Sequence, residues 1–466
     1  MPRNQSSDLA VVARRIARAI DKRRTHAVAP AIDEAALARR LASYDFAQPK
    51  ALGEVTHDLL DLLARYSVRT DHPRYFGLFN PPALIPAIAG DWICAALNPQ
   101  LAVWSHAPAA AEIERKLVQL FGRWIWPEQT VAGTFTSGGS EANMTALLVA
   151  LQARYPRWHQ SGIPRTGRPP GVFVSSESHL AWIKIARMCG LGSQAVQLIP
   201  PADGLALSGT QMQAALSGSD ADPVLVVATA GTTAHGSIDD LSGIAAAGHE
   251  HGAHVHVDAA WAGGALLNGP TRHLFNGIDA ADSVTVDPHK WLAVPMGAGL
   301  FLSRSWQGLE RTFDVANGYM PSASTEHRDA YIHSVQWSRR FIGAKLFASL
   351  ATLGLPGYQH MIARQFELGA RLRTRLAEEQ WQIDNQAQLP LVCFSPPCAG
   401  ERRTLLIRSI AEHVIRDGSA WISVATLRGQ LVLRACITSF ETCEDDLEAL
   451  LKSLNAARTA ALTAVT

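Results

Sequence analysis

The chain has 466 residues, of which 42 are Lys or Arg and 41 are Asp or Glu, so its formal net charge is +1. A chain of this length can bury a large core and is expected to form two or three domains. The balanced charge and the lack of a long basic run argue against nucleic-acid binding, and no apolar run approaches the ~18 residues of a membrane span.

The start of the chain lacks the apolar core of a signal peptide. Its six cysteines contain no CxxC pair and do not resemble a disulfide framework, so we expect them to be reduced. These features predict a soluble, cytoplasmic protein.

Residues 1 to about 70 are rich in Ala, Leu and Arg, with leucines at helical spacing. The basic residues between positions 14 and 24 alternate with apolar ones, which predicts a solvated helix face. A helix lying on a membrane surface is the alternative. His72-Pro73 ends the helical pattern, and Asn80-Pro81-Pro82 predicts a rigid turn.

Between about residues 130 and 305, short apolar and β-branched runs alternate with helical stretches. This alternation is typical of an α/β domain with a mainly parallel sheet flanked by helices. Seven runs predict a seven-stranded sheet: 131–136, 172–175, 196–199, 224–229, 254–257, 284–286 and 299–302.

Beyond this domain, a helical pattern runs from about 337 to 379. Two strand-like runs, 389–394 and 430–437, then flank a helical pattern at 405–416, which predicts a small C-terminal α+β domain. The expected division is therefore a helical N-terminal segment at 1–75, a large α/β domain at 76–345 and the small domain at 346–466.

Lys290 lies in Asp-Pro-His-Lys-Trp (287–291), directly after the predicted strand 284–286. Pro288 cannot donate to a β-ladder, so Lys290 is expected on a loop at a strand end, where reactive groups are often displayed. A lysine at such a position can form an imine with an aldehyde cofactor. Taken alone, it would be interpreted as a surface lysine.

A glycine-rich turn, Thr-Ser-Gly-Gly-Ser-Glu-Ala-Asn (136–143), precedes a helical run. Glycines let the backbone approach an anion, and a helix start offers unpaired N–H groups and a positive dipole end. Gly139 and Ser140 are therefore candidate phosphate-binding residues. An ordinary capped turn is the alternative.

The run His-Val-His-Val-Asp-Ala-Ala-Trp (254–261) places Asp258 at a strand end. A carboxylate there is either a helix cap or the partner that keeps a heteroaromatic nitrogen protonated. His254 and His256 are expected on one face of the strand. Because no Cys or carboxylate joins them at ligand spacing, packed histidines are a better interpretation than a zinc site.

Two further strand ends carry polar residues. Ser-Ser-Glu-Ser-His (175–179) places His179 where an imidazole can lie over a cofactor ring, or serve only structurally. Ala-Gly-Thr-Thr (230–233) has hydroxyls that can bond a ligand or merely tie the turn together. Strand ends of open α/β sheets bind ligands. A lysine, a carboxylate, a stacking imidazole and an anion-binding turn together predict pyridoxal 5'-phosphate (PLP), without a metal.

These motifs resemble the group II PLP-dependent amino-acid decarboxylases, which include the aromatic-L-amino-acid decarboxylases, and they occur in family order from residue 72 to about 450. The resemblance implies the aspartate-aminotransferase-like fold, PLP fold type I. It also implies that Lys290 forms the imine, that Asp258 pairs with the pyridine nitrogen and that His179 stacks on the ring.

The resemblance implies further contacts to the cofactor. Ala260 would pack on the other face of the ring, Thr233 would lie near it, and Gly139, Ser140 and His289 would lie by the phosphate. Asp287 departs from the pattern, because the aromatic amino-acid decarboxylases have a phosphate-binding Asn there. A carboxylate would repel phosphate, so Asp287 is expected to point away from the site.

The implied activity is that of a carboxy-lyase, which converts an L-amino acid to its amine and CO2 through a carbanion stabilised by the cofactor. The family also has a proton-donating tyrosine on a loop, here at about 317–337. Tyr331 is the candidate, and Tyr319 is the alternative because the spacing to residues 338–341 requires a one-residue adjustment.

The segment 98–104, with Phe79 and Trp104, is expected to contribute to the substrate pocket in this fold. It is aromatic and carries no obvious fixed cation, which favours an aromatic or mainly apolar amino acid over an acidic one. The helical N-terminal segment, whose apolar face is too large to bury alone, predicts a homodimer.

Three alternatives remain open. An aminotransferase of the same fold would hold the substrate carboxylate with an arginine, for which Arg434 is the candidate, although we prefer a strand arginine in an ion pair. An aldehyde-forming decarboxylase is disfavoured by His179 together with a loop tyrosine. A non-catalytic scaffold would lack Lys290 or Asp258, and both are present.

Overall fold

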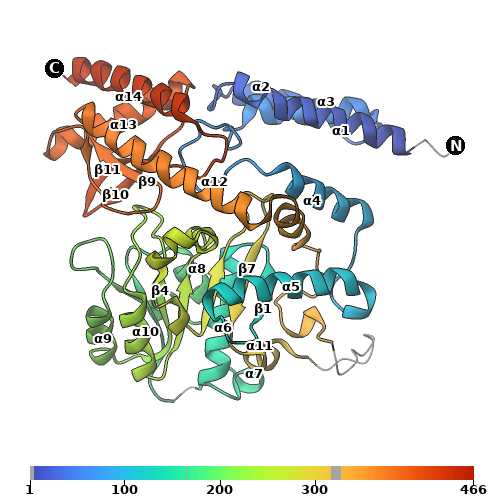
Figure 1. The fold of residues 1–466 in the computed structure, drawn as a ribbon, viewed down its shortest axis with the longest axis vertical. Coiled ribbons are helices and arrows are strands. Elements are labelled where there is room, and N and C mark those ends of the chain that lie inside the picture. Colours follow the sequence, from blue (N-terminus) through green and yellow to red (C-terminus); the bar gives the residue numbers. More distant parts are fainter. Residues whose placement is uncertain (1–4, 165, 316–326, 466) are drawn as a thin grey trace.

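The computed structural model describes residues 5–164, 166–315 and 327–465. A large α/β domain forms one end of the molecule, and the small C-terminal domain lies at the other end, beside the N-terminal helices (Figure 1). These helices are α1 (Gln5–Asp21), α2 (Glu34–Ala42) and α3 (Leu52–Tyr66). Arg24 contacts Asp446 of the small domain at 3.3 Å, which ties the two regions together.

The large domain is built on a seven-stranded sheet. Strand β7 is antiparallel to both of its neighbours, and the other strand pairs are parallel. All seven predicted strands are present. Their order across the sheet is β1 (Ala132–Thr136), β7 (Gly299–Ser303), β6 (Ser283–Val286), β5 (His254–Asp258), β4 (Asp222–Thr229), β2 (Pro170–Ser175) and β3 (Val196–Ile199).

Helices cover both faces of this sheet, as a parallel sheet requires. Strand β4 illustrates the reason, since its apolar run is buried along its whole length. The helices before and around the sheet are α4 (Ile85–Leu97), α5 (Pro108–Ile125), α6 (Gly139–Arg154), α7 (Trp158–Ser161), α8 (Ala181–Met188), α9 (Gly209–Ser217), α10 (Leu241–Glu250) and α11 (Trp306–Phe313).

The long helix α12 (Ala344–Glu378) leads into the small domain and bends at Gly354, whose φ is 64°. It begins later than the predicted position near 337, because the preceding residues are held elsewhere. The backbone N–H of Arg339 donates to Gln100, and its guanidinium pairs with Glu114 at 2.6 Å.

The small domain has an antiparallel four-stranded sheet with its own apolar core. The order is β10 (Ser423–Leu427), β11 (Gln430–Cys436), β9 (Leu391–Ser395) and β8 (Gln382–Ile383), packed with α13 (Gly400–Asp417) and α14 (Glu444–Val465). Strands β8 and β10 were not predicted. The fold class is confirmed, whereas the exact division at residues 75 and 345 stays a prediction.

Within the described part of the chain, no helix combines the length and apolar character needed to cross a membrane. All six cysteines are free thiols. The parallel strands β2, β4, β5 and β6 point the same way, so their carboxyl ends meet at one edge of the sheet. This edge is where the predicted site residues lie.

Candidate active site

A cavity of about 310 Å³ opens at the carboxyl edge of the large sheet. The loops after β1, β2, β4, β5 and β6 all contribute to it. Every residue predicted to contact the cofactor lines this one cavity: Gly139, Ser140, His179, Thr233, Asp258, Ala260, His289 and Lys290. Residues separated by up to 151 positions in the sequence are therefore brought together.

The turn between β1 and α6 contains two glycines that line the cavity and pack closely against neighbouring side chains. A Cβ on Gly139 would lie 2.7 Å from Asp287 Oδ2, and a Cβ on Gly138 would lie 3.1 Å from the His289 ring. Glycine therefore lets the Asp287 and His289 side chains lie close to the turn, and the first N–H groups of α6 are available to an anion in the cavity. The turn is held by Glu141, which accepts from the Ser137 N–H at 2.8 Å.

Asp258 ends β5 and is 6% exposed. Its Oδ1 accepts from the Ala260 N–H at 3.1 Å, and its Oδ2 accepts from the Asn143 amide at 2.7 Å. A buried carboxylate held by N–H donors remains available to pair with a cationic ring nitrogen.

Lys290 follows β6 and is paired with Asp287, whose Oδ2 lies 3.0 Å from the lysine Nζ. The expectation that Asp287 points away from the site was therefore wrong. Asp287 lines the cavity, its side chain is 1% exposed, and its Oδ1 has no hydrogen-bond partner among the described residues. The lysine cation three positions along the chain compensates for burial of this carboxylate.

His289 is buried beside this pair, and burial lowers the pKa of its ring. Its Nδ1 lies 2.7 Å from the Ala298 carbonyl. His179 is exposed at the cavity mouth, and its Nδ1 accepts from the Ala181 N–H at 3.1 Å, which fixes the plane of the ring. Ala260 and Thr233 complete the lining on neighbouring loops.

Three residues predicted to act at this site do not line the cavity of their own chain. Tyr331 lies in a short 3-10 helix, Ala330–Ile332, and its N–H donates to the Ala102 carbonyl at 3.2 Å. Phe79 is buried and stacks on Trp261 with the ring centroids 4.3 Å apart. Trp104 stacks on His327 and lines a different cavity, of about 580 Å³. Tyr319 lies outside the described residues.

Arg434 was expected to form an ion pair, but no carboxylate among the described residues pairs with it. This buried guanidinium donates to the Thr233 carbonyl at 3.0 Å and to the Gly77 carbonyl, and it lies 4.9 Å from the centroid of Phe79. It is a strand arginine, but carbonyl oxygens replace the expected carboxylate. It thereby joins the small domain to the loop after β4.

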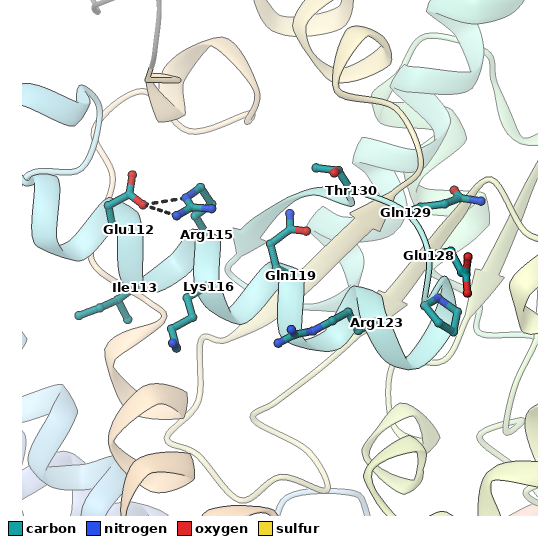
Figure 2. A pocket seen from close by; sticks show the side chains of 10 residues that line it. Glu112, Ile113, Arg115, Lys116, Gln119, Arg123, Glu128, Gln129 and Thr130 are labelled. Carbon is teal, nitrogen blue, oxygen red and sulfur yellow. Dashed lines mark hydrogen bonds and ion pairs between the residues drawn. The ribbon is translucent and has the colours of Figure 1, made fainter.

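A larger, open hollow of about 750 Å³ runs along α5 and the turn that leads to β1 (Figure 2). Its side chains include Glu112 and Arg115, which pair at 2.6 Å. The hollow reaches Thr130, just before β1, whereas the Lys290 cavity begins at Ser137, just after β1. It is thus separate from the site around Lys290.

The cavity lining also includes residues that were not predicted, among them Glu141, Asn143, Trp261 and Met296. Asn143 had a sequence signal, since it is polar and lies four positions after Gly139, on the same side of α6 as the helix start. Met296 had none. It is 65% exposed, and Lys345 holds its loop by donating to the Met296 carbonyl at 2.9 Å.

The chain matches the family model described as "Pyridoxal-dependent decarboxylase conserved domain" over residues 38–396. It is 30% identical to human cysteine sulfinic acid decarboxylase, with 85% of each chain covered. It is also 25% identical to aromatic-L-amino-acid decarboxylase of Bacillus atrophaeus, with 86% of this chain and 84% of the relative covered. A crystal structure of Oryza sativa TDC with PLP and tryptamine superposes with a TM-score of 0.92, at 22% identity and 99% coverage of both chains.

The fold and the cavity define a PLP-dependent carboxy-lyase. The chain belongs to the pyridoxal-dependent decarboxylase family and acts on amino acids. PLP fits the residues present, because the glycine turn at the start of α6, the Asp258 carboxylate and the Lys290 amine all line the same cavity. When bound, PLP supplies the electron sink for the charge left on Cα as CO2 departs.

Replacing Asp287 by asparagine is expected to tighten PLP binding roughly 5- to 30-fold, or about 1–2 kcal/mol, because it removes a buried negative charge from the cavity that receives the phosphate. Absorbance titration of the purified protein with PLP measures this change. Glu128→Gln is the matched control, since Glu128 lies in the separate α5 hollow and should leave the affinity unchanged. Weaker binding in Asp287→Asn would show that the Asp287–Lys290 pair organises the site.

Proposed function

We propose that the chain decarboxylates an aromatic or mainly apolar L-amino acid to its amine at the cavity around Lys290. The observation that carries this proposal is that Lys290, Asp258, His179 and the Gly139 turn line one cavity. Each supplies one part of a PLP site: an amine for the aldehyde, an anion for the ring nitrogen, a flat ring to stack on and N–H groups for the phosphate.

The proposed roles follow from the contacts of each residue. Lys290 would hold the cofactor through its side-chain amine. Asp258 keeps a proton on the ring nitrogen, because its buried carboxylate favours the cationic form. His179 and Ala260 would contact the cofactor ring, and Gly139, Ser140, Thr233 and His289, which line the same cavity, would hold the rest of the cofactor. Orientation of the substrate then decides which bond to Cα is broken.

The charges of the cavity support a substrate without an acidic side chain. Among the described residues that line it, Lys290 is the one lysine and there is no arginine, whereas Glu141, Asp258 and Asp287 are acidic. A second carboxylate or a sulfinate on the substrate would enter a field of its own sign. The relatives include enzymes named for both aromatic and sulfinic amino acids. The substrate class is therefore inferred from the acidic lining of the cavity and not from the relatives.

Incubation of the purified protein and PLP with separate L-amino acids, followed by mass spectrometry of the amines and measurement of CO2, tests this proposal. Tryptophan, tyrosine and phenylalanine should yield amines and stoichiometric CO2 without a keto acid. Cysteine sulfinate, aspartate and glutamate should yield none. Preferred turnover of an acidic substrate would overturn the substrate class, and a requirement for a keto acid would indicate an aminotransferase.

We propose that the active form is a cytoplasmic homodimer. Helix α4 exposes a broad apolar face that includes Ile85, Ile93 and Leu97, the last of which is 76% exposed. Leu59 and Leu63 of α3 are also exposed. Exposed apolar surface of this extent is typical of an interface. Light scattering should give twice the chain mass, and a fully active monomer would contradict the assignment.

We propose that Tyr331 donates, across this dimer interface, the proton that Cα takes up after CO2 leaves, since Tyr331 does not line the cavity of its own chain. Tyr331→Phe should cut amine formation about a hundredfold, the usual contribution of a general acid, while PLP stays bound. Mixing this variant with Lys290→Ala tests the geometry. Hybrid dimers contain one site with an intact lysine and the tyrosine of the other chain.

Activity should therefore reappear in the mixture of the two inactive variants. If Tyr331 acts within its own chain, the mixture stays inactive. Unchanged amine formation by Tyr331→Phe alone would remove this residue from the mechanism.

A further inference from the structure

We infer that Asn143 and His256 are positioning residues, which form a one-directional hydrogen-bond chain that holds the Asp258 carboxylate toward the cofactor ring. This inference rests on the proposed role of Asp258 as the partner of the ring nitrogen. Neither residue was predicted to belong to the site, and His256 does not line the cavity.

The chain of contacts is continuous and buried. Asn143 of α6 donates to Asp258 Oδ2 at 2.7 Å, and the Asn143 Oδ1 lies 3.2 Å from His256 Nε2. The other ring nitrogen, His256 Nδ1, lies 2.8 Å from Ser283 Oγ of β6. The exposed fractions of Asn143, His256 and Ser283 are 2%, 0% and 0%.

The direction of each hydrogen bond follows from what each group can donate. A carboxylate only accepts, so the NH2 group of Asn143 faces Asp258 and its carbonyl oxygen faces His256. Burial lowers the pKa of His256 well below its usual value, so the ring is neutral and carries a single N–H. Because the Asn143 oxygen only accepts, that hydrogen lies on Nε2.

The remaining nitrogen, His256 Nδ1, must then accept, and its donor is the Ser283 hydroxyl. The same Ser283 Oγ lies 2.7 Å from His254 Nε2, so it accepts a hydrogen bond from that ring. Thr285 Oγ1, at 3.1 Å, provides a second acceptor for the His256 Nε2–H. Each hydrogen bond in this series therefore donates in the direction of Asp258.

The packing around His256 keeps the ring in this orientation. Phe301 of β7 lies nearly parallel to it, with the ring centroids 6.3 Å apart, and Trp182 of α8 meets it edge-on at 5.8 Å. Hydrogen bonds aligned in one direction polarise and strengthen one another in a buried site. The consequence is that the Asn143 amide cannot rotate its oxygen toward Asp258 without losing its bond to His256.

Two amide variants of His256 separate this role from a general loss of packing. In His256→Gln, the terminal NH2 lies near the position of the imidazole Nε2, so it can still donate to Asn143. In His256→Asn, the shorter side chain replaces the Nδ1 side of the ring and leaves Asn143 without its donor. Both place an amide in the same buried space, but the glutamine amide reaches Asn143 whereas the shorter asparagine amide reaches only the Ser283 side.

We expect His256→Asn to weaken PLP binding about tenfold and to lower the protonated fraction of the pyridine nitrogen, measured with nitrogen-15-labelled PLP. His256→Gln should stay within about twofold of the parent chain. Circular dichroism and thermal unfolding check that both variants are folded. Equal PLP affinity and equal nitrogen protonation in the two variants would overturn the inference.

A measurement on the parent chain keeps the inference testable even if a variant does not fold. Nitrogen-15 NMR of the histidine-labelled full chain should show His256 protonated at Nε2 and unprotonated at Nδ1, with or without PLP. The opposite tautomer or a doubly protonated ring would refute it. An unprotonated pyridine nitrogen in the parent enzyme would instead refute the proposed role of Asp258, whatever the His256 tautomer.

Discussion

Lys290→Ala is expected to lower amine formation at least about a thousandfold, because the covalent anchor of the cofactor and the amine that exchanges with the substrate are lost together. Lys290 is the one lysine among the described cavity residues, so no neighbouring amine can replace it. The protein should also lose the absorbance of covalently bound PLP. Amine formation and the absorbance spectrum measure the two effects.

Lys290→Arg is the matched control for this prediction. It retains a cation beside Asp287, whose carboxylate lies 3.0 Å from the lysine Nζ, but a guanidinium does not form the covalent bond. We expect Lys290→Arg to be as inactive as Lys290→Ala while its stability stays closer to that of the parent chain. Substantial activity in either variant would contradict the assignment of Lys290.

Asp258→Asn should lower kcat by roughly a hundred- to a thousandfold while PLP remains attached to Lys290, a loss comparable to that of a buried electrostatic contact made in the transition state. The neutral amide occupies the same volume but cannot stabilise a proton on the ring nitrogen. Without that proton the ring accepts less charge as CO2 departs. Steady-state kinetics and the absorbance of bound PLP separate loss of catalysis from loss of cofactor.

Asp222→Asn provides the comparison, because Asp222 is also buried on a central strand but lies at the opposite end, where β4 begins. It is paired with Arg154 and accepts from Tyr155 at 2.9 Å. We expect this variant to lose stability and to retain its kcat. A near-parental kcat in Asp258→Asn would show that Asp258 is not needed as the partner of the ring nitrogen.

The large sheet was predictable because its strands are buried on both faces and therefore appear as short apolar runs between helical stretches. The small sheet was predicted only in part. Strand β10 alternates between half-buried and exposed residues at the sheet edge, and β8 contains two residues, so neither produces an apolar run. The start of α12 depends on the contacts of Arg339 with distant residues, which the local sequence does not contain.

The site was predictable to the extent that its residues follow strands. Lys290, Asp258 and His179 each lie at or just after a strand end, and parallel strands bring such positions together. Asp287 was predicted to point away from the site because a phosphate would repel its carboxylate. The prediction was wrong because Lys290, three positions along the chain, pairs with this carboxylate. Asn143 lies one turn inside α6, and its role depends on its hydrogen bond to Asp258 at the end of β5.

Motif spacing did not predict where Phe79, Trp104 and Tyr331 lie. The Trp104 backbone N–H donates to Asp329 at 2.6 Å, and the Tyr331 N–H donates to the Ala102 carbonyl. These hydrogen bonds hold the segment around Trp104 against the segment around Tyr331. Such docking depends on tertiary contacts between segments more than 200 residues apart.

Reduction of the PLP-loaded protein with borohydride, followed by proteolysis and mass spectrometry, tests the central claim most directly. The account predicts a single pyridoxyl adduct, on the peptide that contains Lys290. An adduct on another lysine, or no adduct in a protein that has bound PLP, would contradict it.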